Sequence, residues 1–155
     1  MIDVALWEPE IPPNTGNIAR LCAATGAALH LIGRLGFRLD DRSLRRAGLD
    51  YWQHLRILHH PTLEQFETAL SDRRVFCFSA HAHVPYTQAR YRSGDCLLFG
   101  GESHGLSDTV LRRYGDRALL IPMPAGKVRS LNLATAVGIA LYEGLRQLSP
   151  WGAAT

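Results

Sequence analysis

Short apolar runs alternate with stretches of helical periodicity along most of the chain. The first run covers residues 2–7, and the prolines that follow end this strand before Asn14 or Thr15 caps a helix. Further strands are expected at 28–32, 55–58, 75–79, 96–99 and 118–121. Further helices are expected at 41–47, 62–70, 107–114 and 131–148. This alternation predicts an α/β fold with a mostly parallel sheet and helices on both faces.

The final helix, 131–148, carries more apolar surface than one face of a sheet would bury. Its apolar stripe is expected to consist of Leu131, Ala134, Gly138, Leu141, Leu145 and Leu148. Val137, Ile139 and Tyr142 add apolar surface outside that stripe, and small residues such as Gly138 allow another helix to approach closely. The pattern fits a homodimer formed through this helix, and it equally fits a central helix buried within one protomer.

A length of 155 residues with 46% hydrophobic residues suits one domain over 1–155, in which 151–155 form a loose tail. Cys22, Cys77 and Cys96 are far apart and lie in apolar segments, so they are expected to be reduced core residues of a cytoplasmic protein. The N-terminal residues lack the pattern of a signal peptide, and no apolar stretch reaches the length of a membrane span.

The formal net charge of +3 favours a polyanionic partner only weakly, because 17 basic residues accompany 14 acidic ones. The densest basic stretch runs from Arg34 to Arg46. Within it, Arg42 and Arg46 are candidate contacts to phosphates. The alternative is a solvated helix with local ion pairs, since Asp40 and Asp41 lie in the same stretch.

Residues 121–136 have the composition of a ligand-binding loop followed by a helix. Two prolines end an apolar strand, a glycine gives backbone freedom, and Lys127 and Arg129 supply positive charge. Ser130 or Asn132 is expected to cap the helix. An ordinary strand-to-helix turn would explain the cap but neither the prolines nor the basic pair, so we interpret the segment as part of a site.

Two familiar chemistries do not fit the other motifs. A Gly-x4-Gly turn follows the strand at 96–99, but Leu106 stands where a phosphate-binding P-loop has its lysine, and Glu102 has the wrong charge for a triphosphate. His81 and His83 lack carboxylates at a helpful spacing, so no metal site is expected.

Three loop motifs at strand ends resemble those of SPOUT RNA methyltransferases. They are Asn-Thr-Gly-Asn-Ile-Ala-Arg at 14–20, Phe-Gly-Gly-Glu-Ser-His-Gly-Leu at 99–106, and Ile-Pro-Met at 121–123 with Arg-Ser-Leu-Asn-Leu-Ala at 129–134. The string Glu-Pro-Glu-Ile-Pro-Pro at 8–13 and the stretch 36–51 are similar to the TrmL-like branch of that family. The likeness covers nearly the whole chain.

The resemblance implies a C-terminal trefoil knot, although true knots are rare among protein folds. It also implies that S-adenosylmethionine binds in a bent form within the knot. The adenine ring would need an apolar slot with backbone donors and acceptors, and Ser130 would hydrogen-bond the cofactor. The cofactor-binding residues expected on this basis are Phe78, Gly100, Glu102, Ile121, Met123 and Ser130.

The TrmL-like branch implies a dimer that methylates the ribose 2′-hydroxyl of the tRNA wobble nucleotide, a cytidine or modified uridine at position 34. The expected catalytic residues are Arg20, Asn14 and Asn132. Because a guanidinium is a poor base, Arg20 is expected to orient the hydroxyl and to pass its proton to an RNA phosphate. For Glu102 and Asn132, a purely structural role as a helix cap or loop brace fits as well as these functional roles.

The resemblance implies that the protein binds the anticodon stem-loop of tRNA. The expected RNA-binding residues are Arg42, Arg46, Arg129 and Tyr142. Tyr142 would reach the RNA across the dimer, and the alternative is a tyrosine of the core. Two other functions stay open: an RNA- or nucleotide-binding module with the SPOUT shape, and a 2′-O-methyltransferase that acts on another RNA position.

Overall fold

One parallel sheet of seven strands organises the computed structural model, which describes residues 1–40, 42, 44, 46, 49–149 and 151. The strands are β1 (Asp3–Trp7), β2 (Leu29–Ile32), β3 (Ile57–His60), β4 (Val75–Phe78), β5 (Val84–Pro85), β6 (Cys96–Gly100) and β7 (Ala118–Leu120). Their order across the sheet is β3-β2-β1-β6-β4-β7-β5, and each neighbouring pair is parallel. The predicted α/β class with a mostly parallel sheet is confirmed.

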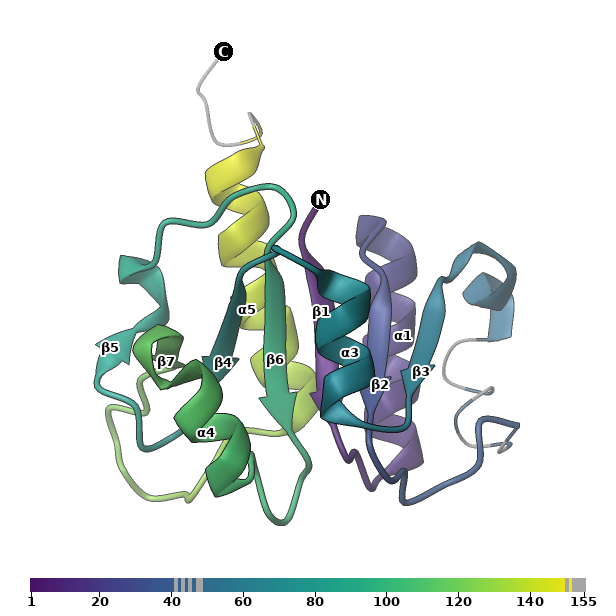
Figure 1. The fold of residues 1–155 in the computed structure, drawn as a ribbon, viewed down its shortest axis with the longest axis horizontal. Coiled ribbons are helices and arrows are strands. Elements are labelled where there is room, and N and C mark those ends of the chain that lie inside the picture. The colour runs from purple at the N-terminus through teal and green to yellow at the C-terminus, as the bar shows by residue number, and fades with distance from the viewer. Residues whose placement is uncertain (41, 43, 45, 47–48, 150, 152–155) are drawn as a thin grey trace.

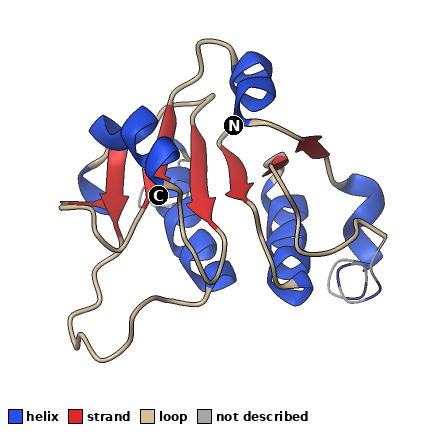
Figure 2. Ribbon diagram, turned by 60° about the horizontal axis from the view of Figure 1, so that its bottom comes forward, coloured by secondary structure: helices blue, strands red, loops and turns tan. Residues whose placement is uncertain are grey.

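Helices cover both faces of the sheet (Figure 1). On one face lie α1 (Pro12–Thr25) and α5 (Leu133–Leu148), and on the other lie α3 (Leu63–Leu70) and α4 (Asp108–Tyr114). The short 3-10 helices are η1 (Leu49–His54), η2 (Tyr86–Gln88) and η3 (Gly115–Arg117). Figure 2 brings the carboxyl ends of the strands forward and shows the long loops that leave them.

Alternating side chains of the strands fill two separate apolar clusters. Leu97 of β6 packs in the cluster beneath α1 and α5, whereas its neighbour Leu98 packs in the cluster beneath α3 and α4. Both side chains are fully buried. Full burial of a leucine contributes roughly 1.5–3 kcal/mol, so each face of the central strand stabilises its own helical layer.

α1 begins earlier than the sequence pattern indicated. Pro12 and Pro13 occupy the first helical positions, and Ile11 precedes them without a side-chain capping bond. Asn14 and Thr15 therefore lie within the first turn, and the prediction that one of them is the N-cap is wrong. Proline suits the first turn because it has no N–H to satisfy there and its φ angle is already helical.

The other element boundaries differ from the predictions in a few places. β3 spans Ile57–His60 instead of 55–58, and β5 was not predicted because Val84 is the only strongly apolar residue beside its proline. Within the expected helix at 41–47, Arg42, Leu44 and Arg46 have helical backbone, and the other four positions lie outside the described residues. The predicted tail at 151–155 likewise lies outside them, apart from Trp151.

Helix ends follow local capping chemistry. Thr62 forms a capping box with Gln65 at the start of α3, and the Ser107 hydroxyl accepts from the Val110 N–H at the start of α4. α1 ends at Gly26, whose φ of 79° is the left-handed conformation that favours glycine. These ends agree with the sequence pattern.

The buried face of α5 differs from the predicted stripe. Its buried residues are Leu133, Val137, Ala140, Leu141, Gly144 and Leu145. Leu148, which the prediction placed in the stripe, is 41% exposed. The helix passes close over the sheet at Gly144, where an added Cβ would lie 2.6 Å from the Cδ1 atom of Ile2. This close approach sets the rotation of the helix, and spacing along the sequence does not reveal it.

The three cysteines are buried and free, as expected for reduced core residues. Burial raises the pKa of the Cys77 thiol to about 11 and that of the Cys22 thiol to about 12, so both thiols stay protonated and inert at neutral pH. Among the described residues, no helix is both long and apolar enough to span a membrane.

A chain of buried polar side chains crosses β1, β2 and β3. Asp3 accepts hydrogen bonds from the Ala28 N–H at 3.0 Å and from the Arg73 guanidinium at 2.7 Å. A ring nitrogen of His30 lies 3.4 Å from Asp3, and the other lies 2.9 Å from a ring nitrogen of His60. Burial, and then the neighbouring imidazoles of His30 and His59, lower the pKa of His60 below its ordinary value.

We expect His60 to make folding stability depend on pH. Because its folded-state pKa is depressed, the unfolded chain binds the proton more readily, and the stability that neutral His60 contributes is lost as pH falls below about 6.5. Urea unfolding measured from pH 7.5 to pH 5 should show the midpoint falling, and His60→Gln should flatten this dependence. Exposed His83→Gln is the matched control and should keep the wild-type slope; equal slopes in all three proteins would contradict the assignment.

Candidate functional site

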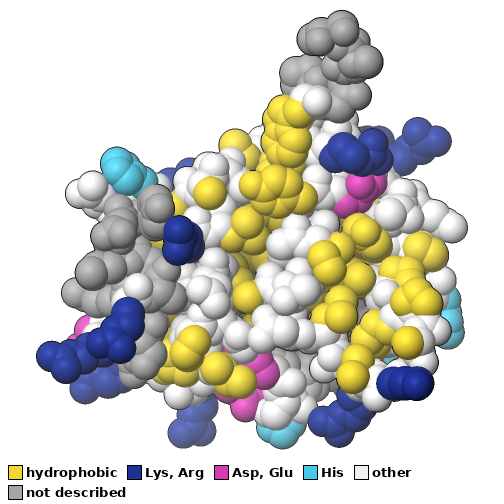
Figure 3. All heavy atoms as spheres, turned by 180° about the vertical axis from the view of Figure 1, so that it is seen from behind, with side chains coloured by type: hydrophobic (Ala, Val, Ile, Leu, Met, Phe, Trp, Pro, Cys, Tyr) yellow, Lys and Arg dark blue, Asp and Glu magenta, His cyan; other side chains and the backbone are white. Residues whose placement is uncertain are grey.

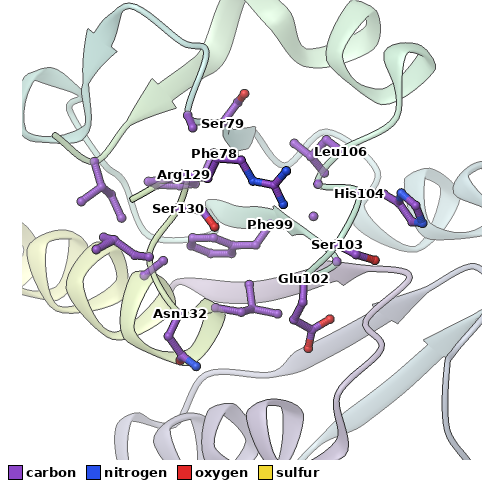
Figure 4. A pocket seen from close by; sticks show the side chains of 18 of the residues that line it. Phe78, Ser79, Phe99, Glu102, Ser103, His104, Leu106, Arg129, Ser130 and Asn132 are labelled. Carbon is purple, nitrogen blue, oxygen red and sulfur yellow. The ribbon is translucent and has the colours of Figure 1, made fainter. Parts of the chain in front are cut away.

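A cavity of about 640 Å³ opens at the carboxyl ends of β4, β6 and β7 (Figure 4). Three segments form most of its wall: 78–81 after β4, 99–106 after β6, and 121–136 from β7 into α5. Ile11 and Asn14, at the start of α1, close the remaining side. All three loop motifs of the sequence therefore meet at one cavity, at the edge where parallel α/β sheets bind ligands.

The floor of the cavity is aromatic and aliphatic. The rings of Phe78 and Phe99 stack with their centroids 4.5 Å apart and 15° between their planes. Ile121, Met123 and Leu133 line the same space. A planar, partly apolar ligand would bury its surface well against this floor.

The turn after β6 is closed so tightly that it requires glycine. The Gly105 N–H donates to the Gly101 carbonyl at 2.9 Å, and Gly105 has a φ of 63°. A Cβ on Gly100 would lie 2.0 Å from the Gly105 carbonyl carbon, and one on Gly101 would lie 2.4 Å from the Glu8 carbonyl oxygen. The turn therefore presents backbone atoms to the cavity, as a site for hydrogen bonds to a ligand's polar edge requires.

Glu102 holds the start of α1 against this turn. Its carboxylate accepts hydrogen bonds from the N–H groups of Glu10 at 2.7 Å and Ile11 at 3.0 Å, and from the Asn14 amide at 3.3 Å. α1 has no side-chain cap of its own, so Glu102 supplies a negative acceptor at its N-terminal end. Glu102 therefore braces the loops, and it also lines the cavity, so its predicted contact with a cofactor stays a prediction.

Glu10, just before α1, in turn accepts hydrogen bonds from Ser103 of the turn after β6. Its carboxylate accepts from the Ser103 N–H at 3.1 Å and from the Ser103 hydroxyl at 2.6 Å. These hydrogen bonds lower the pKa of Glu10 below its ordinary value. We call the four residues Glu10, Ile11, Glu102 and Ser103 the carboxylate clasp, because each loop gives a carboxylate and receives one.

Asn14 joins the clasp to the start of α5. Its side-chain oxygen accepts from the Asn132 amide at 3.1 Å, and the Asn132 oxygen accepts from the Thr135 N–H at 3.2 Å. Asn132 is therefore the N-cap of α5, and of the two caps that the sequence suggested, Ser130 is not the one used. The contact fixes the two asparagines next to each other at the wall of the cavity.

The other predicted site residues fall into two groups. Phe78, Gly100, Glu102, Ile121, Met123, Arg129 and Ser130 line the cavity, and Figure 4 shows the Arg129 guanidinium extending into it. Arg20, Arg42, Arg46 and Tyr142 do not line it. Arg20 is exposed on α1, and a helix carries its Cα about 9 Å along the axis from that of Asn14.

Tyr142 is 45% exposed on α5, so the alternative of a core tyrosine is wrong. Its ring lies 5.8 Å from that of Trp151.

Two functional features were missed from the sequence. The pairing of Glu10 with Ser103 joins residues 93 positions apart, and no local pattern signals it. Ser79 and His81, after β4, also line the cavity, and their place directly after a buried strand was the available signal. Among the described residues, no group of three His, Cys, Asp or Glu side chains is arranged to hold a metal ion.

An apolar cavity with a glycine turn and a basic loop, at the carboxyl edge of a parallel sheet, is typical of α/β proteins that bind nucleotide-like ligands. The chain belongs to the SpoU rRNA Methylase family, whose model matches residues 1–142.

Relatives at the levels of sequence and structure agree with this membership. A tRNA (cytidine(34)-2'-O)-methyltransferase of Aeromonas hydrophila is 45% identical over 149 residues, which are 96% of this chain and 95% of that protein. A solved structure concerned with the 2-OH methylation of C/U34 on tRNA has 53% identity and a TM-score of 0.91, over 96% of both chains. An AdoMet-bound rRNA methyltransferase of Sinorhizobium meliloti has 31% identity and a TM-score of 0.86, over 96% of this chain and 57% of its own.

The clasp predicts a specific sensitivity at Glu102. In Glu102→Gln, an amide NH₂ replaces one acceptor oxygen beside several N–H donors, so we expect the free energy of unfolding to fall by about 1.5–3 kcal/mol. Urea unfolding measures this change. Glu64→Gln, an exposed carboxylate in the first turn of α3, is the control and should change stability by less than about 0.5 kcal/mol. A Glu102→Gln protein as stable as the control would show that the clasp contributes nothing.

Proposed function

We propose that this protein is an S-adenosylmethionine-dependent tRNA methyltransferase that modifies the ribose 2′-hydroxyl of nucleotide 34, a cytidine or modified uridine, in the anticodon stem-loop. The observation that carries the proposal is the convergence of all three motif loops on one cavity, in a chain that matches such proteins over nearly its full length. An AdoMet-bound relative with the same fold supports the cofactor.

The cavity residues fit this cofactor. The stacked Phe78 and Phe99, with Ile121 and Met123, give an apolar slot for adenine, and the backbone of the Gly100–Gly105 turn offers donors and acceptors for its edge. Ser130 lines the cavity with a hydroxyl for the cofactor's polar groups. When bound, the cofactor supplies an electrophilic methyl group.

The protein's own residues would align the ribose oxygen and move its proton. Asn14 and Asn132, held together at 3.1 Å, position the ribose and its backbone at the cavity wall. Arg20, which is exposed on α1, would orient the ribose hydroxyl and an RNA phosphate, and the phosphate would accept the hydroxyl proton directly, because a guanidinium stays charged and serves poorly as a base. Glu102 acts through the clasp by holding α1, which carries Arg20, against the cofactor turn.

We also infer the C-terminal trefoil knot that the family resemblance implies. The loops after β6 and β7, separated in the sheet by β4, both line one cavity with the first turn of α5. A TM-score of 0.91 to a solved relative over 96% of both chains supports the same chain path in this protein.

We further propose that the protein forms a homodimer through α5. Figure 3 shows apolar side chains gathered along the face covered by α1 and α5. Tyr142, Leu148 and Trp151 are 45%, 41% and 60% exposed at the C-terminal end of this face, which fits a partner surface.

The proposed contacts to RNA are Arg42, Arg46, Arg129 and Tyr142.

The reaction is tested by incubating the protein with methyl-labelled S-adenosylmethionine and unmethylated tRNA, and then locating the label by mass spectrometry. We expect label on the ribose of nucleotide 34. Label at another position would favour a 2′-O-methyltransferase that acts elsewhere in RNA. Cofactor binding without any label on the RNA would favour a binding module without methyltransferase activity.

We expect Arg20→Lys to lower kcat about 100-fold, because an ammonium lacks the planar pair of donors that would hold the hydroxyl and a phosphate together. Single-turnover assays on tRNA measure this effect. Arg56→Gln, an exposed change just before β3 at the far edge of the sheet, is the control and should keep the wild-type rate. Unchanged turnover in Arg20→Lys would remove Arg20 from the mechanism.

A further inference from the structure

The acidic residues are distributed unevenly along the chain. Residues 73–94 and 117–142 contain no aspartate or glutamate, yet they hold seven of the 17 basic residues. These two segments contain β4, β7 and β5, which are adjacent at one edge of the sheet, and most of α5. We call these two segments the acid-free side because their own side chains include no carboxylate; Asp72, Asp95, Asp116 and Glu143 bound them in the sequence.

The basic residues of the acid-free side form ion pairs at one end of the strands but not at the other. At the amino ends of the strands, Arg73 and Arg74 form ion pairs with Asp3 and Asp95 at 2.7 Å. At the carboxyl ends, Lys127 and Arg129 stand in a loop whose residues 124–130 are all exposed. Within the described part of the chain, no carboxylate makes an ion pair with either cation. Positive charge is thus left uncompensated at the end where the cavity opens.

The carboxylates at the opposite wall of the cavity and behind it are held in place by hydrogen bonds. Glu102 and Glu10 accept backbone and side-chain hydrogen bonds within the carboxylate clasp. The segment after β4 adds His81 to the wall on the acid-free side. A polyanion that approaches the mouth therefore meets Arg129 on one wall and Lys127 on the loop outside it, while the Glu102 carboxylate on the opposite wall is held by N–H donors.

We propose that the acid-free side is the surface along which the RNA backbone lies, and that Lys127 and Arg129 bind the phosphates next to the nucleotide whose ribose enters the cavity. The identity of the RNA rests on the proposed function, whereas the charged surface does not. Arg129 extends into the cavity and Lys127 stands two residues away on the exposed loop, which places one cation at the mouth and one outside it.

The composition of the chain offers a direct test, because Lys127 is its only lysine. Limited acetylation with an amine reagent can modify just Lys127 and the N-terminal amine. The Met1 amine donates to the Ser93 hydroxyl, beside the amino end of β6, and so serves as an internal reference away from the cavity. We expect an unmethylated anticodon stem-loop to slow acetylation of Lys127 at least about threefold and to leave Met1 unchanged.

A second measurement separates phosphate binding from a general change of the loop. RNA affinity is measured by fluorescence anisotropy from 50 to 300 mM salt for Lys127→Gln, Arg129→Gln and the control Arg56→Gln. Each lost phosphate contact should weaken binding at low salt and reduce the salt slope by about 0.7, the value for single strands. Arg56→Gln should match the wild-type slope, and Lys127→Arg should restore it.

The outcomes distinguish the alternatives. Protection of Lys127 by S-adenosylmethionine alone would assign the loop to the cofactor and overturn the proposal. Unchanged acetylation with RNA, an unreactive Lys127 in the free protein, or an unchanged slope in both variants would overturn it too. If RNA protects Lys127 but nucleotide 34 is not methylated, the proposed function is wrong and the proposed RNA-binding surface is supported. If nucleotide 34 is methylated but RNA does not protect Lys127, the proposed function is supported and the proposed surface is wrong.

Discussion

The hydrogen bonds that Glu102 accepts from the start of α1 are the contacts on which the geometry of the site depends. A helix that opens with two prolines needs few donors satisfied in its first turn, but it has no side-chain cap to fix its direction. Glu102 provides that anchor from the turn after β6, and Glu10 returns it to Ser103. Charge-assisted bonds in both directions hold the arginine-bearing helix and the glycine turn in one relative position.

Local chemistry explains which elements the sequence predicts well. Thr62, Ser107 and Asn132 each cap a helix through bonds to residues three positions on, so a short window contains the whole signal. The buried face of α5 is different, because the contact of Gly144 with Ile2 joins opposite ends of the chain. β5 likewise exists only because β7 lies beside it, with Val84 paired to Leu119.

The same difference between local and long-range contacts decides how much of the candidate site the sequence predicts. The motifs identify the loops, and the fold brings Asn14, Asn132 and Glu102 together as one hydrogen-bonded group. The motifs do not say which side chain contacts a ligand and which holds a loop, because that depends on distances between segments far apart in the chain. Arg20 shows the limit: its motif neighbour Asn14 is buried at the cavity wall, whereas the helix turns Arg20 toward solvent.

The acidic residues connect the stability of the fold with its electrostatics. Asp3, Asp95, Glu10 and Glu102 all accept hydrogen bonds from arginines, amides or a hydroxyl, so these carboxylates hold strands and loops in place. A net charge of +3 understates the local positive charge at the mouth of the cavity, because the loop at 124–130 contains Lys127 and Arg129 and no acidic residue. Among the described residues, no carboxylate forms an ion pair with Lys127 or Arg129 of the loop at 124–130, and a polyanion is the ligand that this separation of charge favours.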